Sequence, residues 1–142
     1  MVTEDYVSFE TAKLLKEKGF DERCFCFYED DGKLYNDMGK YFPDGMNNSE
    51  HEREFGVGIA APSLQMAAKW LRKVQKIYID IGSSVVYVNE DGEIKFDRPN
   101  YTWDIICLEN GETLAYSELA TNYDSYEQAL ETAIVYSLKN LI

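Results

Sequence analysis

Basic residues are scarce in this sequence. It has 14 lysines and arginines against 26 aspartates and glutamates, which gives a formal net charge of -12 at pH 7. A nucleic-acid-binding protein gains affinity by neutralising phosphates with cations, so we expect no generic binding of nucleic acid or of an anionic membrane. The acidity favours solubility. An alternative use for it is that of an acidic DNA mimic, which inhibits a DNA-binding protein.

Long apolar runs and cysteines are scarce as well. No run reaches the roughly 18 to 20 residues that cross a bilayer, and the first residues, MVTEDYVSFE, lack the basic flank and apolar centre of a secretory signal. The three cysteines, Cys24, Cys26 and Cys107, are an odd set in a chain large enough to fold without disulfides. We therefore predict a soluble cytoplasmic protein with reduced thiols.

Catalytic and metal-binding motifs are missing. The single histidine, His51, lies in the polar stretch NNSEHEREF, which we interpret as a loop with an exposed imidazole. Cys24 and Cys26 would share one face of a strand, but a zinc site needs two more ligands, and only Cys107 and His51 remain, without motif spacing. Nothing brings His51 close to Ser49 or Cys24 as a catalytic pair. We predict buried thiols, no metal, no cofactor and no catalytic residue that can be named.

Two short patterns resemble ligand-binding motifs without meeting their requirements. FGVGIAAP fits G-x-G-x-x-A before a helix, yet a polar stretch precedes it where a dinucleotide site needs a buried strand. The acidic turns YEDDGK, NEDGE and LENGE do not have the oxygen donors of a calcium loop at the required spacing. We interpret the three acidic turns as hairpin turns.

The sequence does contain clear helix and strand signals. Helices are predicted from Ser8 to Gly19, from Pro62 or Ser63 to about Gln75, and from Ser125 to the end, where Gln128 completes a capping box. CFCFYEDDGKLYND predicts a β-hairpin that turns at Asp31-Gly32. IYIDI, VVYV and the segments around an Asp-Gly and an Asn-Gly turn predict an antiparallel meander.

These elements predict a single domain over residues 1–142. The fold class is α+β: an antiparallel sheet of short hairpins and a meander, with about three helices packed on one face. Residues 37–58 carry Gly, Pro, Asn and charge without a clear period, so we predict a long loop there.

The helix predicted over residues 62–75 gathers positive charge on one side. Its apolar side holds Leu64, Ala67, Ala68, Leu71 and Val74, with Trp70 at the edge, and its other side holds Lys69, Arg72, Lys73 and Lys76. Cations near a helix C-terminus offset the helix dipole, so this side is either a solvated face or a surface that meets an acidic partner or a second copy of the chain.

Aromatic residues are abundant, with 11 Tyr, 7 Phe and 2 Trp. Such side chains are enriched in the centres of protein interfaces. The segment YNDMGKYFPDGM places Tyr35, Tyr41 and Phe42 in irregular chain, where they form the best candidate for an exposed aromatic patch. The patch either meets a partner or anchors its own loop.

Three blocks, SFETAKLLKEKGF, APSLQMAAKWLRK and SYEQALETAIVYSLKNLI, resemble a family of small proteins of unknown function from gut bacterial genomes. Members of that family are often encoded in or beside prophage-like mobile elements. The resemblance implies a bacterial origin and an association with phage, and it supplies no activity.

The leading hypothesis is a non-enzymatic protein-interaction or regulatory protein of a bacterial or prophage element, which acts on a protein partner or by self-association. Its candidate surface combines Lys69, Arg72, Lys73 and Lys76 with Tyr35, Tyr41 and Phe42. Two alternatives stay open. One is the acidic DNA mimic, and the other is a small enzyme whose scattered site residues leave no local signature.

Overall fold

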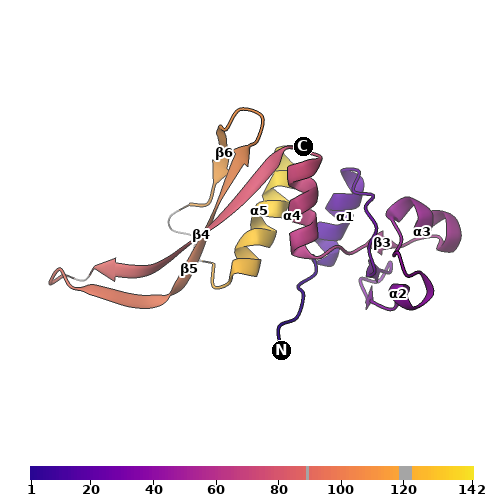
Figure 1. The fold of residues 1–142 in the computed structure, drawn as a ribbon, viewed down its shortest axis with the longest axis horizontal. Helices are drawn as coiled ribbons and strands as arrows, with labels where there is room; N and C mark the ends of the chain where they lie inside the picture. Colours follow the sequence, from indigo (N-terminus) through magenta and orange to yellow (C-terminus); the bar gives the residue numbers. More distant parts are fainter. Residues whose placement is uncertain (89, 119–122) are drawn as a thin grey trace.

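The computed structural model describes residues 1–88, 90–118 and 123–142. Over this part of the chain the fold is α+β, as predicted, with five helices and two three-stranded antiparallel sheets (Figure 1). The sequence had indicated about three helices and one sheet. The two sheets lie toward opposite ends of an elongated molecule, with helices between them (Figure 1).

The C-terminal sheet is a meander of three strands in the order β4-β5-β6. Its strands are β4 (Ile77–Val88), β5 (Ile94–Cys107) and β6 (Thr113–Tyr116). Gly92 and Gly111 have positive φ angles of 79° and 77° in the connections between the strands, which confirms the Asp-Gly and Asn-Gly turns. IYIDI and VVYV form one continuous strand, because Gly82, Ser83 and Ser84 stay paired with β5 and the register shifts only after Ser84.

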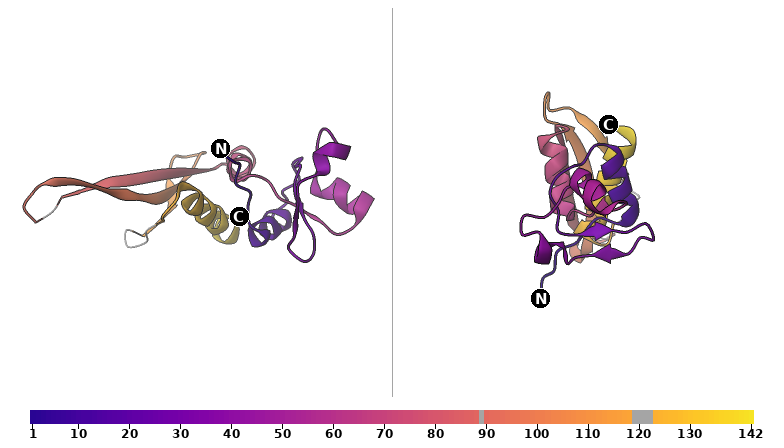
Figure 2. Two further views of the ribbon diagram at one scale, coloured as in Figure 1. Left: turned by 90° about the horizontal axis from the view of Figure 1, so that it is seen from below. Right: turned by 90° about the vertical axis from the view of Figure 1, so that its right-hand side faces the viewer.

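Much of the β4–β5 ribbon extends beyond the helices, as Figures 1 and 2 show. Helix α5 (Tyr126–Asn140) packs against both of these strands at the end nearer the molecular centre, and α4 (Leu64–Lys73) packs against β4. Helix α1 (Phe9–Glu17) packs against α5. The helices therefore cover the C-terminal sheet at one end, and the ribbon projects from the other.

The N-terminal sheet is small, with the strand order β2-β1-β3. Its strands are β1 (Phe27–Tyr28), β2 (Leu34–Tyr35) and β3 (Ile59–Ala60). Phe27 pairs with Tyr35 and Tyr28 with Leu34, which confirms the predicted hairpin. Gly32 has a φ of +82° in its turn.

Residues 37–58 are not a long loop, so that prediction was wrong. They contain α2 (Met38–Tyr41) and α3 (Asn48–Phe55). Asn47 caps α3, and the Asn47 and Glu50 side chains form a reciprocal capping box. Helix α3 is polar along most of its length, and Asn48 is its only buried residue. Its sequence therefore lacks the periodic apolar residues by which a helix can be predicted.

The predicted helix caps are confirmed. The hydroxyls of Ser8, Ser63 and Ser125 accept hydrogen bonds from the amides three residues further on, at 3.1 to 3.2 Å. Gly19 ends α1 with a φ of +93°. At α5 Gln128 Oε1 accepts a hydrogen bond from the Asp124 amide at 3.2 Å. In the predicted capping box the donor is the amide of the next residue, Ser125.

Helix α1 is tied to α5 by one carboxylate. Glu131 Oε1 accepts hydrogen bonds from the Ser8 amide and from the Thr11 hydroxyl, each at 2.8 Å. A carboxylate at this position also offsets the partial positive charge of the α1 N-terminus.

The apolar face of α4 differs from the predicted one at its edges. Leu64, Ala67, Ala68 and Leu71 are buried as expected, but Trp70 is only 5% exposed and Val74 is 53% exposed. Phe20 explains the first difference, because its ring meets Trp70 edge-on at 5.6 Å between ring centroids. Val74 follows the last helical residue, where the chain turns toward β4.

A hydrophobic cluster connects the two sheets and includes residues of α1, α4 and α5. Cys24 and Cys26 belong to it and are 3% and 2% exposed, as predicted for buried thiols. Cys107 is partly buried, and all three cysteines are free. Among residues 1–88, 90–118 and 123–142, no helix has the length and apolar character needed to span a membrane.

Candidate binding site

A pocket of about 530 Å³ opens beside the N-terminal sheet. It is formed by β1, β2, α2, α3 and the segment after α3. Six of its twelve lining residues are Phe or Tyr. The lining residues are Phe27, Tyr28, Glu29, Tyr35, Asp37, Met38, Tyr41, Phe42, His51, Phe55, Val57 and Gly58. This volume falls within the usual range of ligand pockets, about 300 to 1,000 Å³.

The aromatic walls of the pocket are held together by ring contacts. His51 stacks on Phe27 with 4.4 Å between ring centroids and an interplanar angle of 17°. Phe55 meets the His51 ring at 5.4 Å and the Phe42 ring, edge-on, at 5.7 Å. The contacts join α3 to β1 and to the segment after α2, so the pocket wall is preformed.

Several of the lining side chains are open to solvent although they are apolar. Tyr41 is 72% exposed, Val57 65% and Phe55 56%. Single exposed apolar residues are ordinary, but a cluster around a hollow is typical of a binding surface. These three residues make the pocket the best candidate site in the described part of the chain.

His51 lies on α3 in the wall of this site and not in an exposed loop, so that expectation was wrong. Its Nδ1 atom is buried and has no hydrogen bond of good geometry with any described residue. Burial lowers the pKa of His51, by more than the Gly56 backbone raises it, and the nearby Lys16 ammonium lowers the pKa further. The imidazole is therefore neutral at pH 7.

Gly58 gives the imidazole the space it occupies. A Cβ atom at position 58 would overlap the His51 ring, at a separation that real Cβ atoms do not show. The backbone carbonyl of Gly58 also accepts a hydrogen bond from the Lys16 ammonium, at 3.3 Å. The second glycine of FGVGIAAP thus has a packing role that needs no nucleotide.

The Gly58→Ala substitution is expected to displace His51 from Phe27 and to lower the free energy of unfolding by about 1–3 kcal/mol, as for other overpacked sites. Introducing His51→Ala into the same chain removes the overlap, so the double variant should lose less stability than the two single variants together. Urea unfolding of the four proteins measures this coupling. Gly39→Ala is the control, because its Cβ would meet the exposed Phe25 ring at 3.3 Å. Additive losses at positions 51 and 58 would contradict the overlap.

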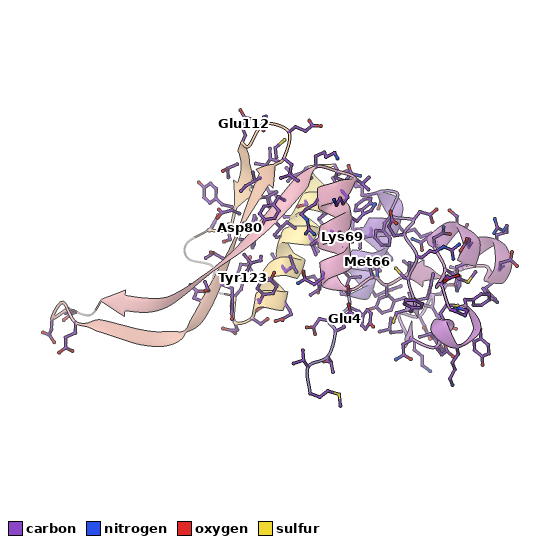
Figure 3. The ribbon with its side chains drawn as sticks, in the orientation of Figure 1. Glu4, Met66, Lys69, Asp80, Glu112 and Tyr123 are labelled. Atoms are coloured by element: carbon purple, nitrogen blue, oxygen red, sulfur yellow. The ribbon has the colours of Figure 1, made fainter. Side chains whose placement is uncertain are left out.

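The structure separates the predicted interaction residues into two groups. Tyr35, Tyr41 and Phe42 all line the aromatic pocket. The lysines of α4 belong elsewhere: Figure 3 shows Lys69 on α4, away from the small helices beside the pocket. The aromatic pocket therefore contains only the aromatic group of the predicted surface.

Two of the four predicted cations border a smaller hollow of about 260 Å³. Lys69 and Lys73 line it together with Glu22 and Trp70. Arg72 and Lys76 do not line it, and Lys76 donates to the Lys73 carbonyl at 3.0 Å. None of these four cations forms an ion pair within the described ranges. Their contact with an acidic partner or a second copy stays a prediction.

Sequence reasoning missed the residues that reach the pocket from other segments. Phe27 was expected only as part of a hairpin, and Phe55 and Val57 were placed in a loop. A usable signal was present, since Phe55 and Val57 are apolar residues after a strongly polar stretch. Only the three-dimensional position of α3 brings them beside Tyr35 and Tyr41.

Comparison with known proteins adds no relative: no protein-family model, curated protein or solved structure matches this chain. Among the described residues, no group of three or more His, Cys, Asp and Glu side chains is arranged to hold a metal ion.

Proposed function

We propose that this protein is a non-enzymatic interaction protein, which binds a protein partner by receiving the partner's side chains in the aromatic pocket. The pocket itself carries the proposal: it is preformed, it is lined mainly by apolar side chains, and its exposed apolar members are Tyr41, Phe55 and Val57. Large aromatic residues at a concave surface are the usual centres of binding energy in protein interfaces.

The arrangement gives less support to an enzyme. His51 is the only imidazole, and its ring is packed between Phe27 and Phe55. A catalytic imidazole is normally oriented by a hydrogen-bonded partner, and within the described part of the chain His51 Nδ1 makes no hydrogen bond of good geometry. A packing role for His51 accounts for its contacts.

The biological setting is part of the same proposal. The resemblance of the helical blocks to proteins of gut bacteria supports an origin in a bacterial or prophage element, and the regulatory role is part of what we propose. A partner in such a setting is a protein of the host bacterium or of the phage.

A photo-crosslinking amino acid at position 41 tests the proposal in cells of the bacterium that encodes the protein. We expect it to capture a distinct partner, whose crosslinked peptide mass spectrometry identifies. The same crosslinker at Tyr116, which is 69% exposed on β6, is the matched control for exposure. Phe55→Ala should abolish the capture at position 41, since truncating a central interface aromatic commonly costs 2 kcal/mol or more, about thirtyfold in affinity. Equal capture from positions 41 and 116, or capture that Phe55→Ala leaves unchanged, would contradict the proposal.

A further inference from the structure

The charge around the aromatic pocket is one-sided. Two carboxylates, Glu29 and Asp37, belong to its lining, and neither lysine nor arginine does. Both acidic residues are exposed, so they border the opening and do not form its base. A purely apolar partner would gain nothing from them.

We infer that the partner side chain that enters the pocket is a cation, an arginine within an apolar segment. The inference rests on the proposed function and adds the chemistry of the partner. It combines three observations: six aromatic rings, two carboxylates at the opening, and a chain that is strongly acidic overall.

Aromatic rings attract cations because the face of each ring carries negative electrostatic potential. One ring of the pocket already has such a contact, since the Lys33 ammonium lies 5.4 Å from the centroid of Tyr35. The pocket offers five further Phe and Tyr rings. Arginine suits these walls better than lysine, because its planar guanidinium stacks on rings and is more weakly hydrated.

Two lysines contact residues of the pocket lining: Lys33 lies over the Tyr35 ring, and Lys16 reaches Gly58. Lys16 is engaged with the Gly58 carbonyl at 3.3 Å and with the Glu52 carboxylate at 3.7 Å. His51 adds no charge at pH 7, because burial lowers its pKa. An entering guanidinium therefore meets aromatic side chains, a neutral imidazole and two carboxylates.

Two peptides test the inference on the full chain: acetyl-Leu-Arg-Leu-amide and its citrulline counterpart, which has nearly the same shape and no charge. Amide NMR spectra report where each peptide binds. We expect the arginine peptide to shift resonances of residues 27–42 and 51–58 and to bind about fivefold or more tightly than the citrulline peptide.

Variants that remove carboxylates test whether Glu29 and Asp37 cause the preference for the arginine peptide. Glu29→Gln with Asp37→Asn should remove most of the preference for arginine. Asp80→Asn with Glu112→Gln is the matched control: it changes the net charge equally, and Figure 3 shows Asp80 on β4 and Glu112 in the turn before β6, both away from the pocket. The control should keep the preference.

The outcomes separate this inference from the proposed function. Equal binding of the two peptides at the pocket would overturn the inference and leave the proposed function standing. An equal loss of preference in both double variants would also overturn it, because the attraction would then come from net charge alone. Shifts from neither peptide would overturn it too, and the crosslinking experiment then decides the proposed function separately.

Discussion

The Trp70→Ala substitution is expected to lower the free energy of unfolding by about 3–5 kcal/mol, the usual cost of truncating a buried tryptophan. Trp70 is 5% exposed, and its ring meets Phe20, which is 1% exposed. The substitution leaves a cavity where α4 meets the segment after α1. Because small domains are stable by only about 5–15 kcal/mol, this is a large part of the total.

Val74→Ala on the same segment is the matched control. Val74 is 53% exposed, so its truncation should change stability by about 0.5 kcal/mol or less. Chemical unfolding can be followed in both variants by the fluorescence of Trp103, which stays in place and is itself buried. A loss below about 1 kcal/mol for Trp70→Ala, or equal losses for the two variants, would contradict the packing described for α4.

The Asn48→Ala substitution is expected to cost about 2–5 kcal/mol, because it leaves two buried backbone groups without partners. Asn48 is 4% exposed at the start of α3. Its Nδ2 donates to the Phe20 carbonyl at 2.8 Å, and its Oδ1 accepts from the Ala60 amide at 2.8 Å. The side chain thus connects α3 to the segment after α1 and to β3.

Asn48→Asp separates the two hydrogen bonds. A carboxylate still accepts from the Ala60 amide, but it cannot donate to the Phe20 carbonyl unless it is protonated. The loss of stability should therefore be large at neutral pH and smaller in mildly acidic solution, relative to the wild-type protein at each pH. Ser49→Ala is the control, because the hydrogen bonds of Ser49 to Asp21 are exposed. A loss in Asn48→Asp that is independent of pH would contradict the assigned donor.

The Asn48 contacts also matter for the pocket. Helix α3 carries His51 and Phe55 into the pocket wall, and its only fully buried side chain is Asn48. Asn48 variants should therefore weaken peptide binding as well as stability. Trp70→Ala changes packing at α4, which supplies no residue to the pocket, so its effect on binding should be small while the protein stays folded.

Local signals predicted much of the fold. Ser8, Ser63 and Ser125 mark helix starts because a hydroxyl cap is a contact within one turn. Gly92 and Gly111 mark hairpins because their positive φ angles suit glycine. Such features depend on neighbouring residues alone, which is why a sequence pattern reveals them.

Features that depend on distant contacts were not predicted. Trp70 is buried by Phe20, fifty positions earlier in the chain, and no helical period contains that information. The continuity of β4 through Gly82 depends on its pairing with Thr102. At the candidate site Tyr35 and Tyr41 could be named from local composition, while His51 and Phe55 required the position of α3.

The hydrogen bonds from Ser8 and Thr11 to Glu131 also bear on how quickly the protein folds. They join residues separated by 123 and 120 positions, so α1 cannot reach its final packing until the chain has been synthesised beyond Glu131. Closing so long a loop costs chain entropy before any contact compensates for it, and proteins dominated by distant contacts fold slowly. During that interval on the ribosome the apolar face of α1 stays uncovered by α5.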